Sequence, residues 1–129
     1  MDYDALVPEV LAIAADAGEK IMAFYRQDYE VTQKQDDSPL TEADMASHHR
    51  IVDGLRSLTP KLPILSEEEE VPWEERRDWE AFWLVDPIDG TKDFIKQTGE
   101  FTVNIALIEN GVPVMGVVTV PALGIEYWG

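Results

Sequence analysis

The chain has 129 residues, of which 45% are hydrophobic, and its formal net charge at pH 7 is −16. This length corresponds to one ordinary domain or to part of a larger protein, and the apolar fraction excludes a disordered chain. The absence of cysteine excludes disulfides and thiolate metal sites, and it fits a reducing compartment. The acidic charge disfavours nucleic-acid polymers and anionic membrane surfaces as partners. A small phosphate substrate would need local positive charge, for which bound metal cations are the obvious source.

The N-terminal sequence has no pattern of a signal peptide. Met1-Asp2-Tyr3-Asp4 is acidic where a signal peptide carries basic residues. No apolar run approaches the roughly 18 residues needed to cross a bilayer. We therefore expect a cytoplasmic protein without a membrane span, and peripheral association with a membrane stays open as an alternative.

Two amphipathic helices are expected in the first half of the chain. Over residues 4–27, apolar side chains recur at steps of three and four and form one stripe. After a polar loop at residues 28–39, the same pattern returns over residues 42–58. Thr41 and Asp44 have the form of a capping box at the start of this second helix.

The second half is predicted to form a β-sheet. The expected strands are residues 63–65, 81–85, 101–108, 112–120 and 125–128. The run 81–85 is continuously apolar, which is typical of a strand buried on both faces. Asn110-Gly111 lies between two of the strands and is a strong signal for a type I′ hairpin turn.

The expected fold class is α+β, with two N-terminal helices packed on an antiparallel sheet. Strand 101–108 carries apolar residues on both of its faces. Two helices can cover only one face of such a sheet, so the other face needs more chain or another copy. We therefore expect an incomplete core and self-association through the uncovered face.

An acidic motif, DPIDGT at residues 86–91, directly follows the apolar strand. Pro87 fixes the backbone of the turn, so Asp86 and Asp89 can point to one side. Carboxylate oxygens are the hard ligands that Mg²⁺ prefers, and Gly90 lets the backbone approach a phosphate closely. The alternative is an ordinary turn without function, because Asp-Pro-x-Asp-Gly is also good turn chemistry.

Glu67 is a second candidate ligand. It stands in a run of four glutamates just after the short strand 63–65. Such a run is usually a solvated loop, but a carboxylate at a strand end is held by the sheet and can be a preorganised ligand.

Asp44 has two readings from its local pattern. It either completes the capping box with Thr41 or, together with Thr91, orients a nucleophilic water. The neighbouring His48 and His49 have no evident partner in the sequence. We expect one of them to face the edge of the core and the other to face solvent.

Together these motifs resemble the inositol-monophosphatase-like, lithium-sensitive, Mg²⁺-dependent phosphatases. The agreement in order and spacing runs along the whole chain, through LTEAD at 40–44, LSEE at 65–68 and WLVDPIDGT at 83–91. The segments KDFIK at 92–96 and GEFTVNIALI at 99–108 look most like the CysQ branch. Members of that branch are 3′(2′),5′-bisphosphate nucleotidases, which remove the 3′-phosphate from adenosine 3′,5′-bisphosphate. Inositol monophosphatase is the rival within the same chemistry.

The resemblance implies two or more Mg²⁺ ions and a role for each motif residue. The implied metal ligands are Glu67, Asp86, the carbonyl of Ile88, and Asp89. The implied substrate-binding residues are Glu67, Ile88, Asp89, Gly90 and Thr91. Asp44 and Thr91 would be catalytic, because they would orient the water for in-line attack on the phosphate. The implied partner is a small phosphorylated nucleotide.

The chain also departs from the family pattern. Members continue into a second α/β half, which supplies a further carboxylate and most contacts to the substrate, and no such motif follows within these residues. We therefore expect residues 1–129 to form the N-terminal metal-binding α+β domain of a layered αβαβα fold, with the C-terminal α/β domain absent from this chain. A catalytically inactive fragment that binds metal or self-associates is the rival reading.

Overall fold

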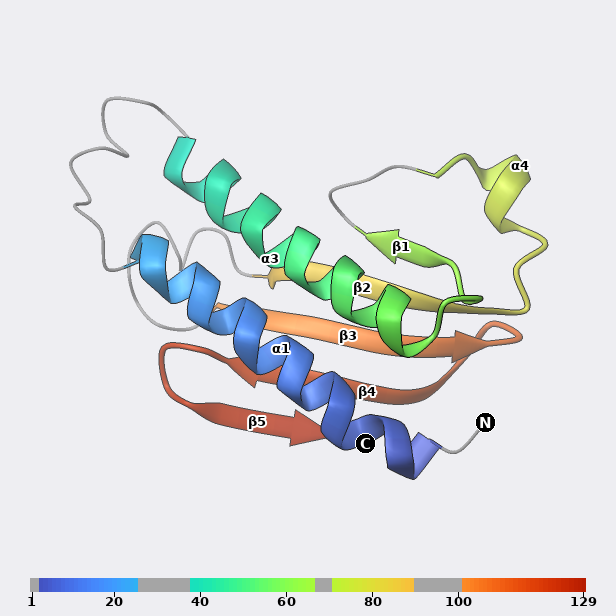
Figure 1. Cartoon of the computed structure of the whole chain (residues 1–129). Helices are drawn as coiled ribbons and strands as arrows, with labels where there is room; N and C mark the ends of the chain where they lie inside the picture. Colours follow the sequence, from blue (N-terminus) through green and yellow to red (C-terminus); the bar gives the residue numbers. More distant parts are fainter. Residues whose placement is uncertain (1–2, 26–37, 67–70, 90–100) are drawn as a thin grey trace.

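The structure is a computed structural model, which describes residues 3–25, 38–66, 71–89 and 101–129 (Figure 1). Its helices are α1 (Tyr3–Tyr25), α3 (Ser38–Leu58) and α4 (Trp73–Arg76). Its strands are β1 (Ile64–Ser66), β2 (Ala81–Asp89), β3 (Thr102–Glu109), β4 (Val112–Val120) and β5 (Ile125–Trp128). The expected α+β class with two long N-terminal helices is confirmed. None of the described helices is long and apolar enough to span a membrane.

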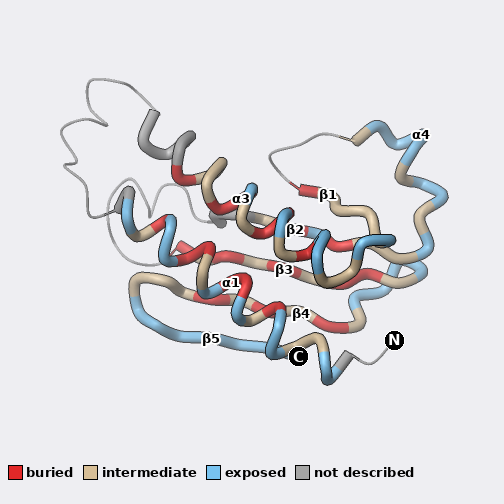
Figure 2. The backbone as a smooth tube through the Cα atoms, in the orientation of Figure 1, coloured by how far each residue is buried: buried red, intermediate tan, exposed pale blue. Residues whose placement is uncertain are grey.

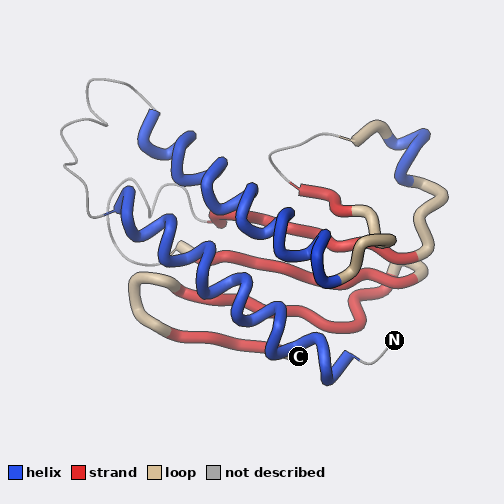
Figure 3. Tube along the Cα trace, in the orientation of Figure 1, coloured by secondary structure: helices blue, strands red, loops and turns tan. Residues whose placement is uncertain are grey.

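The five strands form one sheet in the order β1-β2-β3-β4-β5 (Figure 3). The expected antiparallel pairing holds from β2 to β5, but β1 pairs with β2 in parallel, so the sheet is mixed. A parallel pair needs a crossover of a dozen or more residues. Residues 67–80, which include α4, separate the two strands and are long enough for it.

Both long helices lie on the same face of the sheet, where they bury its apolar side chains (Figures 1 and 2). Helix α1 packs against β3 and β4, and α3 packs against β2. The two helices approach each other closely at Gly54, where an added Cβ would lie 2.8 Å from Cγ1 of Ile13. An ion pair between Arg50 and Asp16 also joins them. The largest fully buried side chains of this core include Trp83, Phe101, Ile21, Ile51 and Leu55.

The opposite face of the sheet is covered by none of the described helices. Along β2, Trp83 and Val85 are buried, whereas Leu84 between them is 40% exposed. The expectation that this strand is buried on both faces is therefore wrong for this chain, because the helices cover one face only. We call the uncovered surface the open face. It includes Leu84, Asp86, Asn104, Ala106, Gly116 and Val118.

The second helix begins earlier than its apolar pattern indicates. Helix α3 starts at Ser38 and not at residue 42, so Thr41 is already helical and cannot be the N-cap that a capping box requires. Pro39 fits this earlier start, because a proline in the first turn loses no intrahelical hydrogen bond. The predicted capping box is thus wrong, and with it the capping role of Asp44. The predicted loop lies outside the described residues except at residues 38–39, which are helical.

The predicted hairpin turn is confirmed. Asn110 and Gly111 have φ of 52° and 78°, and they join β3 to β4 as the two central residues of the turn. Positive φ at both central residues is the requirement of a type I′ turn, whose twist matches that of the flanking strands.

Gly111→Ala is expected to destabilise the fold by about 1 kcal/mol, because an L side chain at this φ meets the neighbouring carbonyl. The free energy of unfolding in urea measures this loss. Gly116→Ala is the control, since its Cβ would lie 3.5 Å from the Ile105 carbonyl, which is ordinary contact. Equal losses for the two variants would contradict the assigned turn.

Candidate metal and phosphate site

The two acidic motifs are reached by strands β1 and β2, which pair in parallel. In the parallel register, Ser66 pairs with Val85. Glu67 and Asp86 are the next residues along the chain. Because paired parallel strands run in the same direction, this register brings Ser66, the residue before Glu67, and Asp86 to the same end of the sheet. Glu67 itself lies outside the described residues.

The described part of the DPIDGT motif, Asp86–Asp89, lies within β2 and not in a turn after it, so the expectation of a turn at these four residues is wrong. Asp86 pairs with Asn104 and Asp89 with Thr102, so β2 advances three residues while β3 advances two. The irregularity between Asp86 and Asp89 is a β-bulge. A bulge tolerates Pro87, because its extra residue is not paired in the ladder and therefore does not need the N–H that proline lacks. In a regular strand, residues three apart lie on opposite faces. The extra residue shifts the alternation by one, so Asp86 and Asp89 pair opposite Asn104 and Thr102 and take register positions on the same face of the sheet.

Asp86 is accessible from the open face. Its side chain is half-buried and lines a hollow of about 290 Å³ together with Leu84, Asn104 and Val118. The hollow is mostly apolar, with the Asp86 carboxylate and the Asn104 amide as its polar groups. The sheet fixes the backbone of this residue, which is one condition for a preorganised ligand.

Helix α3 brings further polar groups to β1. The Oδ1 atom of Asp44 is buried, although the side chain as a whole is only half-buried. One turn later, the buried His48 lies 2.8 Å from Ser66, measured from Nδ1 to Oγ. His49 is exposed, so the expectation that only one of the two histidines faces the core is confirmed.

The His48–Ser66 pair was not identified from the sequence. Two features of the sequence are compatible with this pair. His48 follows Asp44 by one helical turn, which places both on one helix face, and Ser66 immediately precedes Glu67. Neither signal is specific, because pairing of a helix with a strand depends on the tertiary fold.

The predicted site is described in part. Side chains are described for Asp44 and Asp86, and only the backbone is described for Ile88 and Asp89. The other predicted residues, Glu67, Gly90 and Thr91, lie outside the described residues. Within the described part of the chain, no three His, Cys, Asp or Glu side chains group as a metal site. The predicted donors are all carboxylate or carbonyl oxygens, a set that fits Mg²⁺.

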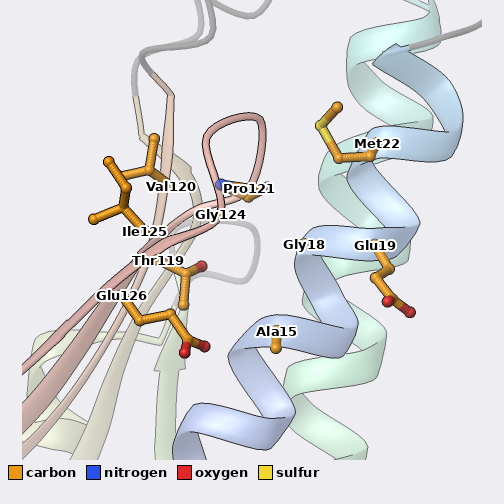
Figure 4. A pocket seen from close by; sticks show the side chains of 10 residues that line it. All are labelled: Ala15, Gly18, Glu19, Met22, Thr119, Val120, Pro121, Gly124, Ile125 and Glu126. Atoms are coloured by element: carbon orange, nitrogen blue, oxygen red, sulfur yellow. The ribbon is translucent and has the colours of Figure 1, made fainter.

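A larger cavity, of about 510 Å³, lies elsewhere, between α1 and the β4–β5 hairpin (Figure 4). Glu19 and Glu126 line it, and so does Thr119, whose buried Oγ1 has no hydrogen-bond partner among the described residues. Two carboxylates without a facing cation repel a phosphate, and none of the predicted site residues lines this cavity. It is therefore unsuited to the chemistry of the acidic motifs.

Comparison with known proteins gives a consistent family. Residues 2–129 match the sequence profile of the inositol monophosphatase family. The chain is 54% identical over 125 residues to the 3′(2′),5′-bisphosphate nucleotidase CysQ of Salmonella typhimurium, covering 95% of this chain and 51% of that protein. The chain thus spans about half the length of the curated relatives that it matches.

Solved structures agree with this family and with the fold. CysQ from Bacteroides thetaiotaomicron aligns with a TM-score of 0.85 at 45% identity, covering 97% of this chain and 45% of that one. Inositol monophosphatase-II from Staphylococcus aureus, in a structure with bound 2′AMP, aligns with a TM-score of 0.75 at 26% identity, covering 97% and 45%. The chain is thus more similar to the CysQ structure than to this inositol monophosphatase.

Proposed function

The chain belongs to the inositol monophosphatase family, and from that premise we propose that it carries the metal-binding part of a Mg²⁺-dependent phosphomonoesterase. The proposed reaction is hydrolysis of the 3′-phosphate of adenosine 3′,5′-bisphosphate. The parallel β1–β2 register carries the proposal, because it brings the chain just before Glu67 and the residue Asp86 to one edge of the sheet. Residues 1–129 would form the N-terminal domain, and a C-terminal α/β domain would add further substrate contacts.

The proposed ligands divide between two ions. The first would be held by Glu67, Asp86 and the carbonyl of Ile88, and the second by Asp86 and Asp89. When bound, Mg²⁺ supplies the positive charge that a phosphate needs at a chain of net charge −16. The β-bulge supports this division, because it gives Asp86 and Asp89 register positions on one face.

The remaining roles fall on groups that bind the phosphate or the attacking water. Backbone N–H groups of Gly90 and Thr91 would donate to the phosphate oxygens, as amides at a phosphate-binding turn do. The Asp44 carboxylate and the Thr91 hydroxyl would accept hydrogen bonds from the water and hold it in line with the leaving oxygen. Since Asp44 does not cap α3, its carboxylate is not required for that role.

The nucleotide is favoured over the inositol ester by similarity. Identity is 54% to a CysQ nucleotidase and 26% to an inositol monophosphatase. The test compares phosphate release from adenosine 3′,5′-bisphosphate and from inositol 1-phosphate by the protein produced from the complete gene. A kcat/KM at least tenfold higher for the nucleotide is expected. A faster inositol ester would assign the chain to the rival substrate.

Three further properties belong to the same proposal. We place the enzyme in the cytoplasm, because a chain without cysteine needs no disulfide and is therefore compatible with a reducing compartment. We also expect Li⁺ to inhibit it, as the family resemblance implies. The fragment reading remains the second candidate, because the chain spans about half of its curated relatives.

Self-association is expected to occur through the open face. Tyr127 pairs with Val118 on that face and is 59% exposed, and Leu84 adds a further apolar side chain. Sedimentation equilibrium of the 129-residue chain should give a mass that rises with concentration. Leu84→Glu should weaken this association, because it places a charge in the apolar contact.

Leu123→Glu is the matched control for this experiment. Leu123 is 60% exposed but lies in the turn between β4 and β5, away from the open face. Its substitution should leave the association unchanged. If both variants weaken the association equally, general charge repulsion is the cause and the open face is not the contact.

A further inference from the structure

The His48–Ser66 pair joins α3, which carries Asp44, to β1, which directly precedes Glu67 in the sequence. His48 lies on α3, one turn after Asp44, and Ser66 is the last residue of β1, directly before Glu67. Nδ1 of His48 lies 2.8 Å from Oγ of Ser66. This hydrogen bond therefore connects the helix of the proposed water-orienting carboxylate to the strand that precedes the proposed metal ligand.

Both partners are held away from solvent. His48 is 4% exposed and Ser66 is 5% exposed. A buried hydrogen bond keeps its geometry better than an exposed one, because separating the partners leaves two polar groups unsatisfied in a medium of low dielectric. The bond thus restricts how the end of β1 can shift relative to α3.

The sheet extends this restriction to the second acidic motif. Ser66 pairs in parallel with Val85, and Val85 directly precedes Asp86. Through this pairing, the bond between His48 and Ser66 adds a second link between α3 and the strand that carries Asp86, besides the direct packing of α3 on β2. Groups that hold a metal ligand in place commonly change metal affinity by 10–100-fold when they are removed.

We propose that His48 is a positioning residue of the phosphatase site, which acts through Ser66 to hold the end of β1 and the neighbouring Asp86 of β2 relative to Asp44. This inference rests on the proposed function, because it concerns the same metal ligands. His48 touches neither substrate nor metal in this role. Its substitution should therefore weaken metal binding more than it slows turnover at saturating metal.

The test measures the Mg²⁺ affinity of the protein produced from the complete gene by isothermal titration calorimetry, without substrate. His48→Ala and Ser66→Ala should each weaken Mg²⁺ binding by about tenfold. The double variant should be no weaker than either single one, since both remove the same bond. His48→Asn should restore most of the affinity, because its amide can place a hydrogen-bonding group near the position of Nδ1.

His49→Ala is the matched control, because His49 is the adjacent histidine on α3 and is exposed. It should bind Mg²⁺ as the parent does. If His48→Ala does not fold, Ser66→Ala and His48→Asn decide the question.

Two failures can be told apart. Lower thermal stability with unchanged Mg²⁺ affinity in the His48 and Ser66 variants would overturn the positioning role and leave the proposed function intact. A parent chain that binds no Mg²⁺ would instead remove the proposed metal site, and the positioning role would fall with it.

Discussion

Asp89→Asn is expected to lower phosphate release from adenosine 3′,5′-bisphosphate by roughly 10²–10³-fold at saturating Mg²⁺. The substitution keeps the shape of the side chain and removes one negative charge from the proposed second metal position. That charge is needed to hold a hard divalent cation against its hydration shell. Initial rates of phosphate release, measured with the parent and the variant side by side, give the ratio directly.

Asp53→Asn is the control for the change in charge. Asp53 is exposed on α3, and no role is proposed for it. Its variant should match the parent, and an equal loss in both variants would point to net charge and not to the site.

The isolated chain also separates the enzyme from the fragment reading. Turnover by these 129 residues that Asp89→Asn abolishes would exclude an inactive fragment. No turnover in the parent, combined with a higher melting temperature in Mg²⁺, would support a metal-binding fragment. Activity unaffected by Asp89→Asn would contradict the assigned ligand.

Features set by neighbouring residues were predicted well from the sequence. The hairpin follows from Asn110-Gly111, because few residues other than Asn and Gly accept positive φ at both central turn positions. Strand β4 was predicted at its observed bounds, Val112–Val120, and α1 ends within two residues of its predicted end. In these segments the apolar period and the local turn chemistry agree.

Features set by distant contacts were predicted poorly. The parallel pairing of β1 depends on a crossover through residues 67–80, and no local pattern distinguishes it from an antiparallel strand. The bulge at Pro87 depends on β3 continuing alongside the motif, so the sequence showed a turn there instead. The start of α3 at Ser38 was missed because the apolar stripe begins later than the helix.

The candidate site shows the same division. The family motifs supplied its candidate residues, but the parallel pairing of β1 with β2 and the contact of His48 with Ser66 come from the tertiary fold. A residue such as His48 has no motif of its own, because its role depends on a partner 18 positions away in the chain.

Trp83→Ala is expected to destabilise the chain by about 3–5 kcal/mol, which is a large share of the stability of a domain this size. Trp83 is fully buried beneath the helices, and its Nε1 donates a hydrogen bond of 2.8 Å to Oγ1 of Thr59. Removing the indole leaves a cavity in the core and removes one of the two hydrogen bonds of the Thr59 hydroxyl, which still donates to the Leu55 carbonyl. Urea unfolding followed by circular dichroism measures the change in the free energy of unfolding.

Two matched variants separate packing from hydrogen bonding in that loss. Trp83→Phe keeps most of the buried ring and removes only the donor, so it should cost about 1–2 kcal/mol. Trp128→Ala removes the same side chain from a position that is 64% exposed, and it should change stability by less than about 1 kcal/mol. If Trp128→Ala costs as much as Trp83→Ala, an indole on the edge strand β5 contributes as much to folding as one beneath the helices. That result would contradict the assignment of the helix-covered sheet face as the main core.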